Sequence, residues 1–244
     1  KEDDIDFLIW NKNTFKPLNT FNNYRLSKIR NITENIFQKR IAKLTNENSV
    51  NFKGAYIADF NISDKDKYYI INASLRSDKI KEGIEDIYYL IEQVKKYGFL
   101  QSELDKAKKE IIQSLEKFLT SEETRSSSSF VNEYIRHYTE DEMISGPEKY
   151  IEYTKNILPT ISLSEINNYF ENYIKDENQI LQIKGPLSIK NLPDKKEIDE
   201  IKNIVIAKKI DRYEYKLKKV ELIKDDLKGS NITKTKFYPN SNVK

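Results

Sequence analysis

The order of apolar and polar positions in the first 75 residues predicts a strand, a long helix and two further strands. Residues 5–10 (IDFLIW) form a short apolar run suited to a buried strand. From about residue 22 to 44, apolar residues recur at intervals of two to five, which is compatible with one amphipathic helix. Strand candidates at 52–62 and 68–75 are separated by the turn-forming residues 63–66, so an antiparallel hairpin is expected.

The pattern between residues 80 and 160 is predominantly helical. Apolar residues at helical spacing from residue 80 to 94 predict a helix that stops at Tyr97-Gly98, because glycine commonly terminates helices. Ser102 is an N-cap candidate for the amphipathic segment SELDKAKKEIIQSLEKFL. Gly146-Pro147 predicts a turn before the segment EKYIEYTKNIL, which Pro159 ends.

The last predicted elements lead to a change of character near residue 188. Ser162 and Glu165 have the spacing of a capping box, and residues 179–184 (QILQIK) predict a final strand. Beyond Gly185-Pro186 the chain is rich in Lys and Asn, and its periodicity is weaker. We therefore expect a folded domain over residues 1–187 and a linker arm over 188–244, in which IDEIKNIVIAKKI can still be a helix packed on the domain.

The residue inventory excludes several kinds of site. One histidine, His137, cannot form HExxH or the inverted HxxEH, because both motifs need two imidazoles to hold zinc. The absence of cysteine removes thiol nucleophiles, iron–sulfur sites and disulfides. Six widely separated glycines do not form a phosphate-binding loop. We therefore predict no catalytic, cofactor-binding or metal-binding residue in this segment.

Charge and hydropathy narrow the classes of partner. Lys+Arg 42 against Asp+Glu 39 gives a net charge of +3, and the two signs are interspersed, so no nucleic-acid surface is indicated. No apolar run approaches the ~20 residues of a membrane span, and from the first residues given we expect no secretory-type leader. The chain opens KEDDIDFLIW without an initiator methionine, so we expect it to be a piece of a longer protein.

Several separated motifs occur in a recognisable order between Gly98 and Ile174. They are Gly98-Phe99, the helix Glu103-Leu104-Asp105-Lys106-Ala107-Lys108, Arg125-Ser126, the segment from Asn132 to Tyr138, and Leu158-Pro159-Thr160-Ile161. This arrangement resembles the second domain of bacterial insulinase-family (pitrilysin-like) zinc proteases. Upstream, QKRIAKLTNENSVNFKGAYIADF is similar to the helix and edge strand of that domain, so the resemblance covers roughly residues 1–185.

The resemblance implies an α+β fold, with a mostly antiparallel sheet packed against helices. It also implies a parent protease whose halves each contain two similar domains and close around peptide substrates as a clamshell, with residues 188–244 as the arm that leads to the next domain. Zinc is then expected in the parent, on an HxxEH helix of the first domain, and no cofactor is expected in this segment. The implied partners are that zinc-bearing domain, the C-terminal half and peptide substrates. The resemblance leaves the compartment open between bacterial periplasm and cytoplasm.

The family also uses an Arg/Tyr pair that assists catalysis from its last domain. At the corresponding place Tyr56 matches the tyrosine, but the arginine position falls near Thr45. Because of this departure we interpret Tyr56 as a packing residue.

Other residues that suggest chemistry have plainer interpretations. We expect His137 to be a partly buried structural residue on a helix, and Arg136 to form surface ion pairs with Glu133 and Glu140. The serine run 126–129 is expected to be a flexible joint, since no base other than His137 is near it. The acidic pairs Glu122-Glu123 and Asp141-Glu142 carry little information without a pocket. We expect Tyr88-Tyr89 and Tyr150/Tyr153 to be core and sheet–helix contacts.

Two functions are consistent with these observations. The first is a non-catalytic domain of a zinc metallopeptidase, which provides scaffold and part of the substrate chamber. The alternative is a stand-alone peptide-binding or chaperone-like module, which receives extended peptides at an exposed sheet edge by strand addition.

Overall fold

Within the described residues, four antiparallel strands form one sheet in the order β2-β3-β1-β4. The computed structural model describes residues 4–13, 19–62, 67–120, 126–214 and 234. The strands are β1 (Ile5–Asn13), β2 (Phe52–Asn61), β3 (Lys67–Leu75) and β4 (Gln179–Lys184). The predicted hairpin is confirmed as the antiparallel pair β2–β3, although its turn at residues 63–66 lies outside the described residues.

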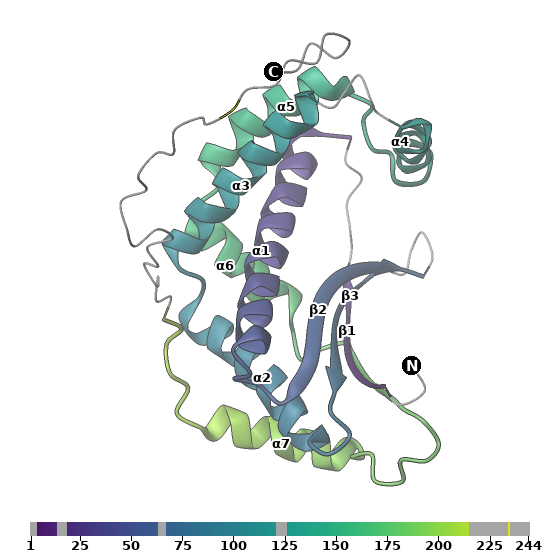
Figure 1. Cartoon of the computed structure of the whole chain (residues 1–244), viewed down its shortest axis with the longest axis vertical. Coiled ribbons are helices and arrows are strands. Elements are labelled where there is room, and N and C mark those ends of the chain that lie inside the picture. Colours follow the sequence, from purple (N-terminus) through teal and green to yellow (C-terminus); the bar gives the residue numbers. More distant parts are fainter. Residues whose placement is uncertain (1–3, 14–18, 63–66, 121–125, 215–233, 235–244) are drawn as a thin grey trace. The chain divides into compact units, whose positions relative to one another are not determined.

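Helices pack on one face of this sheet, with α1 and α2 in direct contact with its strands (Figure 1). The described residues form eight helices. They are α1 (Phe21–Asn46), α2 (Ile80–Tyr97), α3 (Gln101–Thr120), α4 (Ser127–Glu140), α5 (Gly146–Ile157), the short 3₁₀ helix η2 (Leu158–Thr160), α6 (Leu163–Tyr173) and α7 (Lys195–Ala207). The predicted α+β fold, with an antiparallel sheet packed against helices, is confirmed. The chain separates into one compact unit of residues 1–212 and a second of residues 213–244, and all of these strands and helices belong to the first.

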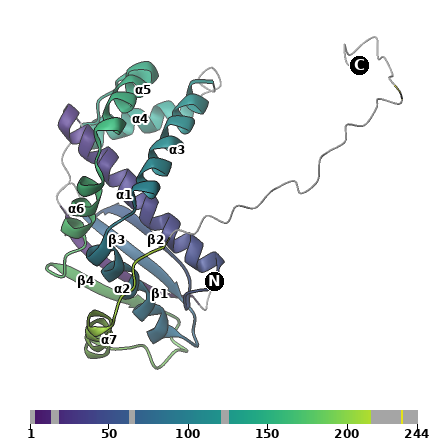
Figure 2. The same ribbon diagram turned by 90° about the vertical axis from the view of Figure 1, so that its left-hand side faces the viewer.

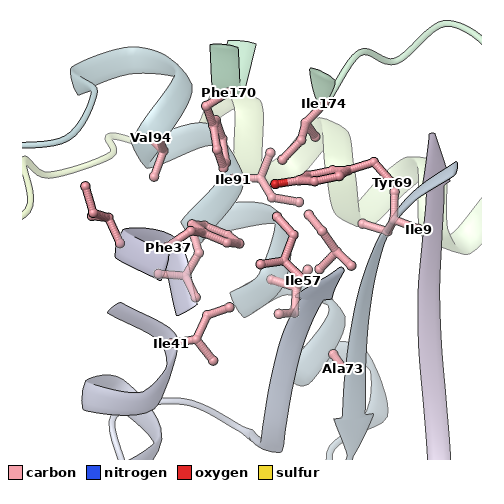
Figure 3. Close-up of a cluster of buried hydrophobic side chains, with 14 of the residues drawn as sticks. Ile9, Phe37, Ile41, Ile57, Tyr69, Ala73, Ile91, Val94, Phe170 and Ile174 are labelled. Atoms are coloured by element: carbon pink, nitrogen blue, oxygen red, sulfur yellow. The ribbon is translucent and has the colours of Figure 1, made fainter. Parts of the chain in front are cut away.

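Strand β1 lies in the middle of the sheet, and its alternate residues point to opposite faces. Ile5, Phe7 and Ile9 point into the helical layer and are fully buried. Figure 3 shows the core that they join: Phe37 of α1 lies next to Phe170 of α6, with ring centroids 5.0 Å apart. The apolar run of residues 7–10 therefore reflects a strand with apolar neighbours on both faces.

A buried ion pair joins α1 to the beginning of α3. Arg40 is 1% exposed, and its Nε and Nη2 donate to the two carboxylate oxygens of Glu103 at 2.8 and 2.6 Å. Nη2 also donates to the carbonyl oxygen of Gly98 at 3.2 Å. Glu103 Oε2 accepts a further hydrogen bond, from the backbone N–H of Leu100 at 2.7 Å. Glu103 therefore both neutralises Arg40 and satisfies a backbone donor at the start of α3.

The junction between α2 and α3 explains the Gly98-Phe99 motif. Gly98 ends α2 as predicted, with a φ of +68°, a conformation that favours glycine. A Cβ at this position would lie 2.5 Å from Nδ2 of Asn167. The Oδ1 of the same Asn167 accepts a hydrogen bond from the backbone N–H of Phe99 at 2.8 Å. Glycine therefore allows α6 to approach and hold this junction.

Two local predictions about helix ends are wrong. Helix α3 begins at Gln101, so Ser102 lies exposed in its first turn and is not the N-cap. Gly146 and Pro147 are not a turn before a helix but the first residues of α5, where proline is tolerated because its missing N–H would have no intrahelical partner. The prediction that helix α5 stops near Pro159 is confirmed, since it gives way to η2 after Ile157.

The predicted capping box of Ser162 and Glu165 is confirmed at the start of α6. Glu165 also pairs with Arg25 of α1, whose Nη1 and Nη2 donate to its two carboxylate oxygens at 2.6 and 3.0 Å. These hydrogen bonds from Arg25 are the main reason why the pKa of Glu165 is lowered to about 2. One carboxylate thus both caps α6 and attaches it to α1.

Helix α7 confirms that the segment after residue 188 contains a helix packed on the domain. It begins with a second capping box, formed by Asp194 and Glu197, and its residues Ile198, Ile201 and Val205 join the buried core. It packs against α2, as both views show (Figures 1 and 2). The assignment of residues 188–244 as an arm that leads to a further domain stays a prediction.

Candidate functional site

The face of the sheet opposite the helices carries apolar side chains that do not belong to the main core. In Figures 1 and 2 the described helices that pack on the sheet lie on its other side. The strand register places Ala58, Ile70, Trp10 and Ile180 side by side on this open face, one from each strand in the order of the sheet. An apolar row therefore crosses the whole width of the sheet.

Aromatic side chains extend this row toward one end of the strands. Phe60 and Tyr68 are register partners on β2 and β3, and each lies edge-on to Trp10, with ring centroids 5.5 and 5.8 Å away. Phe60 is 48% exposed and Ile180 is 54% exposed, although both are large apolar residues. We call the set of Trp10, Ala58, Phe60, Tyr68, Ile70 and Ile180 the open-face patch.

Tyr56 lies beside this patch, and its predicted role is wrong. Its side chain is 50% exposed on the open face, so it is not a core packing residue. Its hydroxyl accepts a hydrogen bond from Nδ2 of Asn72 at 3.1 Å. Thr45 lies in the last turn of α1, where its hydroxyl donates to the carbonyl oxygen of Ile41. The sheet separates Tyr56 from α1, so the structure does not bring these two residues together.

His137 is exposed on α4, so the prediction of partial burial is wrong. Its Nδ1 lies 2.6 Å from the carbonyl oxygen of Glu142. Arg136 pairs with the carboxylate of Glu142 at 2.7 Å, a partner beyond the end of the helix that helical spacing did not indicate. As the sole imidazole of the chain is directed at a backbone carbonyl, the residues around it do not fit a zinc site.

The remaining sequence candidates fall into structural positions. Ser126 precedes α4, but residues 127–129 form its first turn and are not part of a joint, so that prediction is wrong for these three serines. Asp141 ends α4 in the left-handed region, and the pair Glu122-Glu123 lies outside the described residues. Tyr88 is buried and edge-on to Phe7 at 5.9 Å, which confirms the predicted sheet–helix contact. Tyr150 contacts Tyr24 of α1.

A polar cluster that the sequence did not reveal lies between α1, β2, β3 and α6. Arg30 donates to Asp59 at 2.7 Å, and Glu34, one turn further along α1, lies 3.9 Å from the Nε of Arg30. Burial, and then the charge of Asp59, raise the pKa of Glu34 to about 8. Burial and these same carboxylates raise the pKa of Tyr69. Glu34 is therefore protonated at neutral pH, in the layer between helix and sheet.

The raised pKa of Glu34 predicts that stability falls with rising pH. A carboxyl whose pKa is higher in the folded state contributes its full stability below its unfolded pKa, near 4.5, and loses it as the pH rises through about 8. Glu34→Gln imitates the protonated form and removes this dependence. Between pH 5 and 9 we expect wild type to lose on the order of 2 kcal/mol more than Glu34→Gln, allowing for solvent screening. Urea unfolding across this range measures it, and parallel curves for the two proteins would contradict it.

The described residues contain neither a metal-binding cluster nor a membrane-spanning helix. No group of three or more His, Asp or Glu side chains among them is placed to hold a metal ion. None of the described helices is both long and apolar enough to cross a membrane. The absence of catalytic and ligand-binding residues from this segment stays a prediction.

Comparison with known proteins finds similarity at the level of structure. No protein-family model matches the sequence, and no curated protein does. Among solved structures, the first half of the periplasmic protease PqqL from Escherichia coli is similar with a TM-score of 0.81 at 12% identity, over 87% of this chain and 46% of that chain. An insulinase-family protease predicted in Yersinia pestis gives 0.71 at 13% identity, over 83% and 44%.

A third similar structure is an M16 peptidase inactive domain from Pseudomonas fluorescens, with a TM-score of 0.56 at 14% identity over 75% of this chain and 41% of that chain. Against the whole PqqL chain, the match covers 91% of this chain and 25% of that one. This chain therefore spans less than half of each of these solved chains, and one quarter of whole PqqL. At such identities the likeness concerns the fold.

Proposed function

We propose, from the premise that this chain has the fold of the insulinase (M16) peptidase family, that it is a non-catalytic domain of a larger zinc metallopeptidase. In this proposal the zinc and the hydrolytic chemistry belong to another domain of the parent polypeptide. This domain contributes scaffold and, through its open-face patch, part of the surface that holds peptide substrates. The single imidazole and the lack of cysteine support the assignment of chemistry elsewhere.

The open-face patch is the observation that carries the proposal. Ile70 at the centre of the patch is only 5% exposed, but Phe60 and Ile180 are about half exposed. Exposed apolar side chains raise the free energy of a protein in water, so a group of them commonly marks a site of interaction. The patch combines an apolar row across the four strands with partly exposed aromatic rings. It therefore suits unfolded polypeptide segments with apolar side chains. Such segments can bury their apolar surface against the patch whatever their exact sequence.

The position of Trp10 allows a direct test. It is the sole tryptophan of the chain and lies in the patch, so its fluorescence reports on this face alone. We expect titration of residues 1–244 with a reduced, carboxymethylated protein free of tryptophan to shift Trp10 emission to shorter wavelength. Phe60→Ser should weaken this binding about tenfold, because a buried aromatic contact worth roughly 1.5 kcal/mol is lost.

Ile204→Ser is the matched control, since Ile204 is similarly exposed but lies on α7. It should leave the fluorescence titration unchanged. Emission that does not respond to the unfolded protein, or equal affinity of Phe60→Ser and wild type, would contradict a role of the open face in peptide binding. Zinc-dependent and chelator-sensitive cleavage of peptides by residues 1–244 would contradict the non-catalytic assignment.

The alternative function, a stand-alone module that binds peptides by strand addition, is favoured by one observation. Strands β2 and β4 are the two edges of the described sheet, and each pairs with a neighbour on one side. A peptide added there hydrogen-bonds through its backbone, whereas a peptide on the open face is held by its side chains. N-methylation of alternate peptide amides therefore separates the two modes, because it abolishes strand addition and leaves face binding intact.

A further inference from the structure

Helix α4 presents an amphipathic pattern turned away from the protein. Val131, Tyr134, Ile135 and Tyr138 follow the spacing i, i+3, i+4, i+7, which places them on one face of a helix, within about 100° of arc. In a water-soluble domain such a stripe normally packs against the core. Here the four side chains are between 52% and 89% exposed. We call them the α4 stripe.

The opposite face of α4 carries polar contacts with the segment that follows the helix. Arg136 pairs with Glu142 at 2.7 Å, and Nδ1 of His137 lies 2.6 Å from the Glu142 carbonyl oxygen. Glu133 and Arg136 line a hollow of about 620 Å³. Its remaining walls come from α1, α3, α5 and the segment that joins α4 to α5. The polar side thus faces this hollow and the segment after the helix, and the apolar side is exposed.

The exposed area is large enough to belong to an interface. With aromatic side chains presenting 150–250 Å² each, the α4 stripe leaves on the order of 500 Å² of side-chain surface exposed. The apolar area exposed on this one helix is therefore as large as the largest apolar patch of an ordinary monomer, which is about 300–600 Å². Contacts between domains of one chain bury about 600–1,500 Å² in total. The stripe supplies most of one side of such a contact.

We infer that the α4 stripe is the docking surface for an adjacent domain of the same polypeptide. Because the inference places this chain in a longer protein, it rests on the proposed function. The inference is supported by how much of the similar protein lies outside the region that this chain matches. The match covers 46% of the solved half of PqqL and 25% of the whole. A neighbour of similar size is therefore expected within the half, and an apolar, mostly uncharged surface on that neighbour is the chemistry that fits the stripe.

The lack of cysteine in the chain provides a clean test. Ile135→Cys places a single thiol in the stripe, and its reaction with a thiol reagent is measured in residues 1–244 and in the full polypeptide, whose other cysteines are replaced by serine. We expect the thiol to react about tenfold or more slowly in the full polypeptide, because docking must open before the reagent enters. Ile204→Cys, which begins with similar exposure on α7, should react equally fast in both.

A cross-linker attached at Ile135→Cys then identifies the occupant by mass spectrometry. Cross-links to another domain of the same chain support the inference. Equal labelling rates in the two proteins, or cross-links between two copies of the chain, would overturn it. A stripe that becomes protected only when lipid vesicles are added would also overturn it. Neither measurement involves Trp10 or the open face, so a failed peptide-binding experiment and a failed docking experiment are separate results.

Discussion

Replacement of Glu103 by alanine is expected to lower the free energy of unfolding by about 3–5 kcal/mol. The reason is that Arg40 is 1% exposed and Glu103 is its carboxylate partner at 2.6–2.8 Å, so the substitution leaves a guanidinium charge buried without that partner. It also removes the acceptor of the Leu100 N–H. Urea unfolding of residues 1–244, followed by far-ultraviolet circular dichroism, measures the change.

Two further variants separate a buried charge from a general loss of packing. The double substitution Arg40→Met and Glu103→Leu removes both charges, and it should recover much of the lost stability, since apolar residues often replace a buried pair without penalty. Lys39→Ala breaks the half-exposed pair of Lys39 with Glu110 between the same two helices, and should cost about 0–1 kcal/mol. A loss in the double variant as large as in Glu103→Ala would show that the charge is not the cause.

Phe170→Ala is expected to cost about 3–5 kcal/mol, the other large effect. Phe170 is fully buried in α6, where its ring meets those of Phe37 from α1 and Phe99 from the α2–α3 junction, at 5.0 and 5.5 Å. Truncation therefore leaves a cavity at the point where three segments converge. The midpoint of thermal unfolding checks it, with Phe21→Ala as control, because Phe21 is mostly exposed and should cost under about 1 kcal/mol. Similar losses in both variants would contradict the assignment.

Much of the fold follows from periodicity, because burial imposes a period of two on strands and 3.6 on helices. The run IDFLIW, the stripe from Ile80 to Val94 and the Ser162–Glu165 box each became the expected element. The errors occur where tertiary contacts decide the outcome. Ser102 was expected to cap the start of α3. Instead, the carboxylate of Glu103 accepts a hydrogen bond from the backbone N–H of Leu100, because Arg40 already holds that carboxylate there.

The candidate site was less accessible from the sequence. Exposed and buried apolar side chains look alike in one dimension, so His137, with apolar neighbours along α4, was expected to be partly buried. The open-face patch unites residues from four strands, and only the register shows that Trp10 lies between Ile70 and Ile180. The cluster of Arg30 and Glu34 carried a signal, their i,i+4 spacing, but Asp59 is 25 to 29 positions away in the chain.

The last residues of the compact unit are fastened to α2 at several points. Nε2 of Gln93 and the hydroxyl of Tyr97 donate to the carbonyl oxygens of Asp211 and Ile210, and the N–H of Asp211 donates to the hydroxyl of Tyr89. The polypeptide that continues past Arg212 therefore leaves from a central helix and not from the margin of the sheet. A force applied to the chain at Arg212 would therefore act first on α2, and through α2 on the buried core.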